Sequence, residues 1–121
     1  MPHLTIEYTE NLRDYFDPAA AVQHINTAVL ADGEFEPEQV KTRALSLPFY
    51  RVGHADSGEA FVHVRIHVVH GRSLEVRQQL GKLALAAVQK ALLPAPGLTV
   101  QLTAEVNEMQ AETYQKIVIS S

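Results

Sequence analysis

The sequence predicts an α+β fold in which two consecutive β-α-β units form one four-stranded mixed sheet, with two helices on one face. Four segments alternate apolar and polar residues with the period of two that is typical of half-buried strands. Two longer segments repeat apolar residues at helical spacing. The order strand, helix, strand occurs twice along the chain, and right-handed crossovers make the two strands of each unit parallel.

Length and composition favour a single domain. The 121 residues divide into a first unit of about 2–47, a second unit of about 60–107 and a C-terminal tail of 108–121. No apolar run approaches the roughly 18–20 residues of a membrane span, and no export signal opens the chain. The absence of cysteine excludes disulfides and thiol chemistry. We therefore expect a cytoplasmic protein that does not interact with membranes.

The first unit has clear boundaries. Alternation over residues 3–8 predicts its first strand, and alternation over residues 40–45 predicts its second. Asp17 is placed to cap the helix between them, with Pro18 at the first helical position. Gly33 lies where a C-terminal cap belongs.

The second unit repeats this order. Residues 60–68 form the most regular alternation of the chain and predict a strand. Ser73 is placed to cap a helix, whose apolar stripe extends over residues 80–91. Residues 98–106 alternate again as a fourth strand. Residues 117–119 then form a short apolar run that is able to pair with another strand edge.

Two helices cover only one face of a four-stranded sheet. The other face carries polar side chains, among them Thr5, Glu7, Arg65 and Thr103, and contacts either water or another subunit. The apolar run in the tail favours the second alternative. We expect a homo-oligomer.

Composition and spacing exclude several classes of function. Binding to nucleic acid relies on basic patches, whereas this chain has a net charge of −4. RNA-binding domains with this element order carry aromatic residues on the central strands, and only Phe61 lies on the third predicted strand. His63 and His67 share a strand face about 13 Å apart, too far to ligate one ion. We expect no metal and no nucleic-acid partner.

Pro2 is the candidate catalytic residue. If Met1 is removed, the ring nitrogen of Pro2 changes from an amide to a secondary amine. A terminal amine has an unperturbed pKa of roughly 7.7–8.0, which burial or nearby positive charge lowers. A base with a pKa near the working pH suits general-base catalysis. If Met1 is retained, the nitrogen stays an amide and cannot act as a base.

Four cationic side chains are candidates for binding a carboxylate. An acidic protein binds an anionic metabolite where a few such side chains converge. The planar fork of arginine suits bidentate carboxylate binding, and Arg72 also stands at a predicted helix N-terminus, which favours anions. The candidates are Arg13, Lys41, Arg43 and Arg72.

Four stretches of the chain form a recognisable set. They are Pro2-His3-Leu4-Thr5-Ile6-Glu7, Asn11-Leu12-Arg13, Ala60-Phe61-Val62-His63 and, most specifically, Gly71-Arg72-Ser73-Leu74-Glu75-x-Arg77-Gln78-Gln79. This set resembles the 5-carboxymethyl-2-hydroxymuconate isomerase family of the tautomerase superfamily, whose members carry an amino-terminal proline. The resemblance implies a tautomerase-like fold, a homotrimer and a cofactor-independent isomerase of homoprotocatechuate breakdown.

The resemblance also implies roles for individual residues. Pro2 moves a proton between carbons of an unsaturated 2-hydroxy or 2-keto carboxylic acid through a dienolate. Arg72 binds the substrate, and so does a cation of the second strand, for which we favour Arg43 over Lys41. Arg13 matches in position and is expected to reach the site of a neighbouring subunit.

Three further expectations stay open at this level. Phe49 or Phe61 is expected to form the apolar wall beside the proline. A different reaction on the same scaffold, such as hydration or dehalogenation, needs an extra carboxylate near Pro2, for which Glu7 is the candidate. A non-catalytic trimeric protein that binds carboxylates is the third alternative, and it applies if Met1 is retained.

Overall fold

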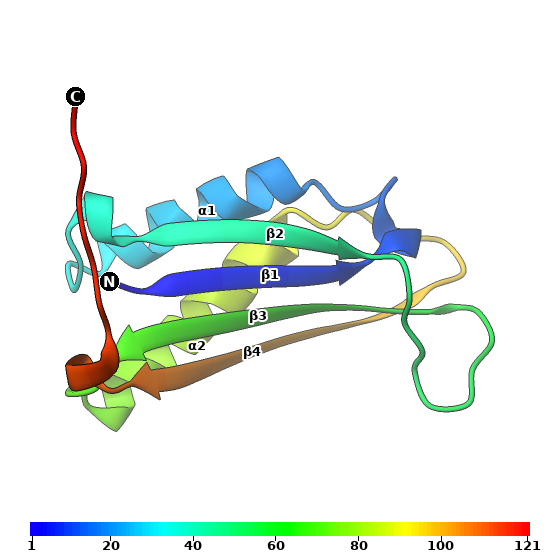
Figure 1. Ribbon diagram of the computed structural model, residues 1–121. Coiled ribbons are helices and arrows are strands. Elements are labelled where there is room, and N and C mark those ends of the chain that lie inside the picture. Colours follow the sequence, from blue (N-terminus) through cyan, green and yellow to red (C-terminus); the bar gives the residue numbers. More distant parts are fainter.

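The structure, a computed structural model, describes residues 1–121. Its four strands form one sheet in the order β2-β1-β3-β4. β1 is parallel to β2, β3 is parallel to β4, and the two central strands β1 and β3 are antiparallel. The predicted mixed sheet of two β-α-β units is confirmed (Figure 1). The strands are β1 (His3–Thr9), β2 (Lys41–Leu47), β3 (Glu59–Val69) and β4 (Thr99–Met109).

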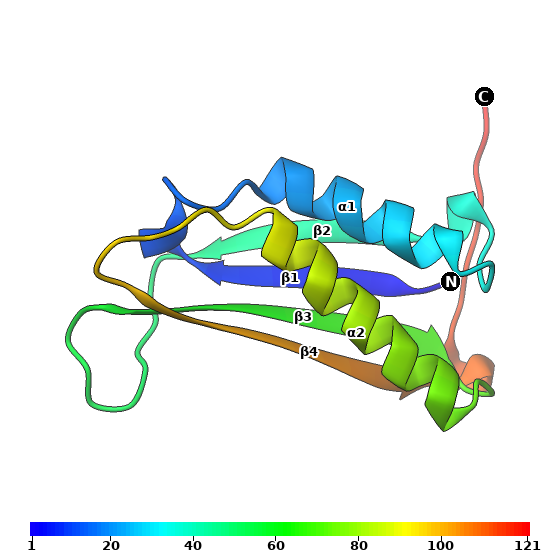
Figure 2. The ribbon, with the colours of Figure 1, turned by 180° about the vertical axis from the view of Figure 1, so that it is seen from behind.

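Two helices, α1 (Pro18–Ala31) and α2 (Leu74–Lys90), cover one face of the sheet (Figure 2). Asp17 and Ser73 cap them as predicted, because each side chain accepts a hydrogen bond from a backbone N–H of the first turn. Gly33 follows α1 with a φ of 79°, a conformation that favours glycine. Neither helix has both the length and the apolar character that a membrane crossing requires.

The core lies between the sheet and these helices. Alternate side chains of the central strands β1 and β3 point into it, as their period of two predicts. α1 and α2 each contribute one apolar face, so that all layers meet in one cluster of 19 buried residues. Fully buried members of this cluster are Leu4, Ile6, Ile25, Val62, Val64, Leu80, Ala84 and Val88.

β4 is longer than the predicted strand of residues 98–106. It continues to Met109 because β3 also continues to Val69, and the two strands stay paired in register to their ends. A 3-10 helix, η3 (Ala111–Thr113), then turns the chain. The tail of residues 114–121 leaves this turn and passes the amino terminus in both views (Figures 1 and 2).

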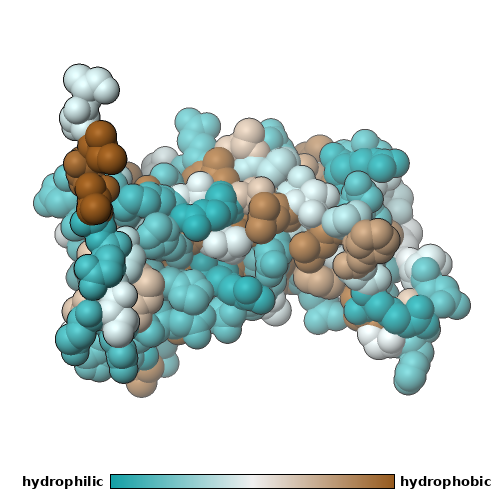
Figure 3. Space-filling model, in the orientation of Figure 1, coloured by the Kyte–Doolittle hydropathy of each residue, from teal (hydrophilic) through white to brown (hydrophobic).

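The open face of the sheet carries a network of charged side chains at its centre. Arg65 lies 3.6 Å from the carboxylate of Glu7 and 3.3 Å from that of Glu105. The His63 ring lies 3.0 Å from the same Glu105 carboxylate. This hydrogen bond is the largest of the effects that lower the pKa of Glu105. The face is therefore largely hydrophilic, as Figure 3 shows, and the predicted polar residues lie on it.

Candidate active site

The pairing of the strands brings residues from both units to one end of the sheet. Because β1 and β3 are antiparallel, Pro2 at the start of β1 lies at the same end as Arg72, which follows β3. β2 runs parallel to β1 and begins at this end, where the Lys41 N–H donates to the Pro2 carbonyl oxygen over 3.2 Å. Pro2 is buried. Three of the predicted site residues thus meet in one corner.

The terminal amine of Met1 lies in this corner, and its pKa is lowered from 8.0 to about 6. Burial is the largest cause, because it disfavours the charged amine. Positive side chains lower the pKa further, in the order Lys41, Lys116 and Arg72, whereas Glu38 raises it. The corner therefore favours an uncharged amine at neutral pH.

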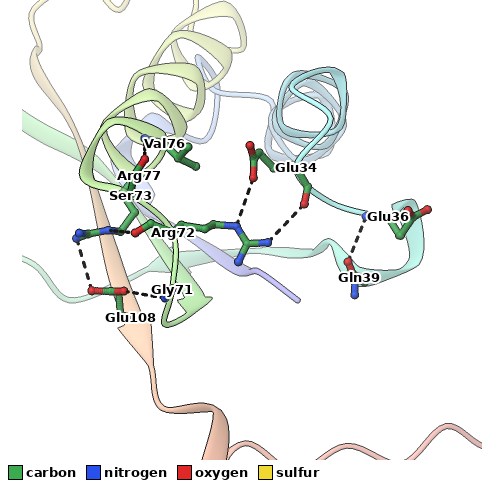
Figure 4. Close-up of polar contacts among 9 residues, drawn as sticks. All are labelled: Glu34, Glu36, Gln39, Gly71, Arg72, Ser73, Val76, Arg77 and Glu108. Carbon is green, nitrogen blue, oxygen red and sulfur yellow. Dashed lines mark hydrogen bonds and ion pairs between the residues drawn. The ribbon is translucent and has the colours of Figure 1, made fainter.

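Arg72 is held by the loop that connects α1 to β2 (Figure 4). Its guanidinium donates to the Glu34 carbonyl oxygen over 3.4 Å and lies 3.8 Å from the Glu34 carboxylate. The guanidinium carbon also lies 4.3 Å from the centre of the Phe35 ring, within the range of a cation–π contact. These contacts fix the side chain, which remains 25% exposed. A fixed and partly exposed guanidinium is suited to binding a carboxylate.

The turn that carries Arg72 is also held from the other side, by the end of β4. The Gly71 N–H donates to the Glu108 carboxylate over 3.4 Å, and Arg77 lies 3.6 Å from the same carboxylate (Figure 4). Arg77 in turn donates to the Arg72 carbonyl oxygen over 3.3 Å. The φ of Gly71 is 131°, which side chains rarely permit. The extra length of β4 thus contributes to positioning Arg72.

Arg43 makes a different set of contacts from Lys41. Arg43 lies two residues beyond Lys41 on β2 and pairs with Thr5 of β1, so it is further from Pro2. Its guanidinium donates to Nδ1 of His3 over 2.8 Å. Because a guanidinium only donates, Nδ1 accepts, and the neutral ring carries its proton on Nε2. Of the two candidate cations on β2, Lys41 is therefore nearer the amine, and Arg43 is bound to a histidine.

The His3 ring connects this corner to the tail. Its Nε2 lies 3.0 Å from the Tyr114 hydroxyl, to which the protonated nitrogen donates. Burial lowers the pKa of the His3 ring, and the charges of Arg43 and Lys41 lower it further. The neutral ring thus bridges a cation of β2 and a tyrosine of the tail.

Other predicted residues lie away from the corner within the chain. Arg13 follows the 3-10 helix η1 (Glu10–Leu12) at the opposite end of β1, whose seven residues span roughly 20 Å. Phe49, which is 93% exposed, and Phe61 also lie toward that end. Glu7 pairs with Arg65 on the open face. The Phe35 ring lies in the corner, against Arg72.

The structure adds residues that the sequence did not point to. Tyr114 and Lys116 belong to a tail with no periodic pattern, so no local signal marked them. Phe35 is an aromatic residue between two glutamates in a short connection, and it is buried. An apolar ring in such a polar segment was the only local sign that it packs against another element. No group of three His, Asp or Glu side chains is arranged to hold a metal ion.

Solved structures share this architecture. A crystal structure of a 5-carboxymethyl-2-hydroxymuconate isomerase from Deinococcus radiodurans R1 is 28% identical, with a TM-score of 0.81 over 96% of this chain and 88% of that one. A fused 4-OT described as a symmetric trimer is 16% identical, with a TM-score of 0.68 over 89% and 85% of the two chains, and supports the fold alone. The fold is that of the tautomerase superfamily.

The sequence identifies the family to which the chain belongs. The profile of 5-carboxymethyl-2-hydroxymuconate isomerase matches residues 2–120. An Escherichia coli 5-carboxymethyl-2-hydroxymuconate Delta-isomerase is 27% identical over 89 residues, which are 74% of this chain and 71% of the relative. The chain belongs to the 5-carboxymethyl-2-hydroxymuconate isomerase family, and the resemblance found in the sequence is confirmed.

Proposed function

We propose that the protein is a cofactor-independent isomerase that moves a proton between carbons of an unsaturated 2-hydroxy or 2-keto carboxylic acid such as 5-carboxymethyl-2-hydroxymuconate. Its base is Pro2 after removal of Met1. The observation that carries this proposal is the corner itself, where burial and three cations lower the pKa of the Met1 amine, one residue from the Pro2 nitrogen, to about 6. Membership in the family supports the class of reaction.

The secondary amine of Pro2 takes a proton from one carbon, so that a C–H bond breaks and an N–H bond forms. The electron pair delocalises into the conjugated system as a dienolate. The same proton then returns from nitrogen to another carbon, which restores the amine and needs no cofactor. The nearby cations serve twice, because they keep the amine unprotonated and stabilise the negative charge of the dienolate.

Arg72 and Lys41 bind the substrate carboxylate nearest the reacting carbons. Arg72 offers a planar, partly exposed guanidinium, and Lys41 acts as a point charge. Lys41 makes no ion pair and donates only to the Gln39 carbonyl oxygen over 3.2 Å. Arg43, bound to His3, is available to a second carboxylate further along β2.

Arg13 is assigned to the site of a neighbouring subunit in a homotrimer. Within its own chain it stands at the opposite end of β1, roughly 20 Å away for a strand of seven residues. It is exposed and makes no ion pair, so its charge is free for another subunit. The open sheet face offers a surface over which subunits associate.

Two measurements test the proposal. The intact mass of natively produced protein is expected to correspond to residues 2–121, with Pro2 first. Turnover of 5-carboxymethyl-2-hydroxymuconate, followed by its ultraviolet absorbance, is expected to fall at least about 100-fold in Pro2→Ala, the lower end of general-base contributions. A mature protein that keeps Met1, or a Pro2→Ala variant with parental turnover, contradicts the mechanism. Dehalogenation of 3-chloroacrylate without isomerisation favours the other reaction on this scaffold.

A further inference from the structure

The C-terminal tail crosses the corner that holds the terminal amine. β4 ends at Met109, the 3-10 helix η3 turns the chain, and residues 114–121 then run past the start of β1 in both ribbon views (Figures 1 and 2). Its apolar residues Ile117, Val118 and Ile119 are 87%, 73% and 89% exposed, so they do not pack on the core. Contacts other than packing into the core therefore hold the tail at this position.

Tyr114 is the anchor of the tail. Its hydroxyl lies 3.0 Å from Nε2 of His3, and the centres of the two rings lie 6.0 Å apart. Tyr114 is half-buried, whereas its neighbours on both sides are exposed. Because His3 directly follows Pro2, the tail is attached one residue away from the proposed base.

Lys116 lies two residues beyond this anchor. Two residues span at most about 7 Å, so Lys116 stays close to the Tyr114–His3 contact at the start of β1. It makes no ion pair or hydrogen bond, and its charge is therefore not neutralised within the chain. Its effect on the terminal amine supports this position, because it lowers the pKa of that amine more than Arg72 does.

We propose that Lys116 is a specificity-determining residue, which the tail brings to the active site to bind a substrate carboxylate that lies away from the reacting carbons. Tyr114 positions the tail through His3. The inference rests on the proposed function for the identity of the substrate, but not for the binding of a polycarboxylate. It assigns the tail a direct contact with the ligand.

The number of cations in and beside the corner fits a ligand with more than one carboxylate. Lys41, Arg43, Arg72 and Lys116 are four of the ten basic residues of a chain whose net charge is −4. Arg72 is partly neutralised by Glu34, and the other three have no acidic partner within 4.0 Å. A monocarboxylate would satisfy only part of this charge. A tricarboxylate gives each end of the site a partner.

The test compares Lys116→Ala with Lys82→Ala, which removes an exposed, unpaired lysine of α2 outside the corner. Kinetics are measured with 5-carboxymethyl-2-hydroxymuconate, which has three carboxylates, and 2-hydroxypenta-2,4-dienoate, which has one. Lys116→Ala is expected to raise KM for the tricarboxylate about tenfold, the loss of one charge-assisted contact. Because Lys116 also lowers the pKa of the terminal amine, the variants are compared at a pH well above that pKa, where kcat and the KM for the monocarboxylate stay unchanged. Lys116→Arg restores the KM, and Lys82→Ala changes nothing.

A second readout does not depend on turnover. Calorimetric binding of tricarballylate, an unreactive tricarboxylate, is expected to weaken about tenfold in Lys116→Ala and to weaken less in Tyr114→Phe. If the parent protein turns over neither substrate but Lys116→Ala weakens tricarballylate binding, the proposed function fails and the role of the tail stands. If Lys116→Ala equals the parent in both KM and tricarballylate binding, the role of the tail is overturned, whatever the activity.

Discussion

The two ends of the sheet are built alike and differ in what they can do. At one end the Lys41 N–H donates to the Pro2 carbonyl oxygen over 3.2 Å, and at the other end the Thr99 N–H donates to the Gly58 carbonyl oxygen over 2.8 Å. Each bond joins the residue before the first strand of a unit to the first residue of its parallel partner. The backbone arrangement is thus duplicated.

The two ends differ in their cationic residues and in the path of the C-terminal tail. Arg13 and Arg72 each follow the first strand of a unit, so each end of the sheet has an arginine at this equivalent position. Only one end adds Lys41, where the other has the uncharged Thr99, and only that end is crossed by the tail. Duplication therefore explains the scaffold, and the departures from it explain the candidate site.

The largest expected effect on turnover comes from keeping the nitrogen of residue 2 in a peptide bond, as the nitrogen of Gly58 already is. A glutamine inserted between Met1 and Pro2 keeps the proline nitrogen in an amide bond, as at Gly58. Turnover of 5-carboxymethyl-2-hydroxymuconate is expected to fall at least about 100-fold, because the base is lost. A glutamine added after Ser121 is the control and leaves kcat unchanged. Parental kcat in the extended protein would remove the terminal amine from the mechanism.

A second expectation concerns the arginine at the opposite end. Arg13→Ala is expected to lower kcat/KM about tenfold, the value of one charge-assisted contact. If Arg13 serves a neighbouring subunit, unfolding the Arg13→Ala and Pro2→Ala proteins together and refolding the mixture restores part of the activity. Some sites in the mixed oligomer then combine an intact Pro2 with an intact Arg13. A mixture with no more than the activity of its Arg13→Ala component argues that each subunit works alone.

A third, smaller effect is expected on pH dependence. Positive charge lowers the pKa of the Met1 amine in this corner, with Lys41 first among the charges. The same charge acts on a Pro2 amine in that corner, so Lys41→Ala is expected to raise the pKa of the base. The acid limb of the kcat/KM profile, which reports the base of the free enzyme, therefore moves to higher pH, and activity near pH 6 falls most. Thr99→Lys adds a cation at the other end and is expected to leave the limb in place. An unmoved limb in Lys41→Ala would assign that limb to a different group.

The smallest effects compare the two helix caps. Asp17→Ala and Ser73→Ala each remove a capping hydrogen bond and are expected to lower the free energy of unfolding by about 1 kcal/mol, measured with urea. Only Ser73→Ala is also expected to raise KM, because Ser73 directly follows Arg72. Equal KM values in the two variants would show that the cap does not help to position Arg72.

Local signals in the sequence were sufficient to predict the fold. The alternation of β1 and β3, the Asp17 and Ser73 caps and the position of Gly33 each act within a few residues. The overrun of β4 to Met109 was not predictable in this way, because it depends on pairing with the end of β3. Strand length is set by the partner as well as by the segment itself.

The site was predictable only where a chain end or a turn marked it. Pro2 and Arg72 stood out by position, and the structure brings them to one corner. Lys41 and Arg43 were harder to separate, because residues two apart on a strand share a face. The contact of His3 with Arg43 distinguishes them. The positions of Tyr114 and Lys116 could not be predicted from the sequence, because a tertiary hydrogen bond between Tyr114 and His3 positions the tail.

The equivalence of Pro2 and Gly58 has a consequence for circular permutation. The connection of residues 48–58 extends beyond the sheet at the end that lacks the amine, and the tail already passes the amino terminus (Figure 1). A permuted chain with its present ends joined, a new start at Gly58 and the substitution Gly58→Pro would move the free amine to the corner of Thr99. The same strands would then offer a base where they now offer a peptide bond. In a repeated fold, the point at which the ring of elements is opened selects which of two similar corners becomes reactive.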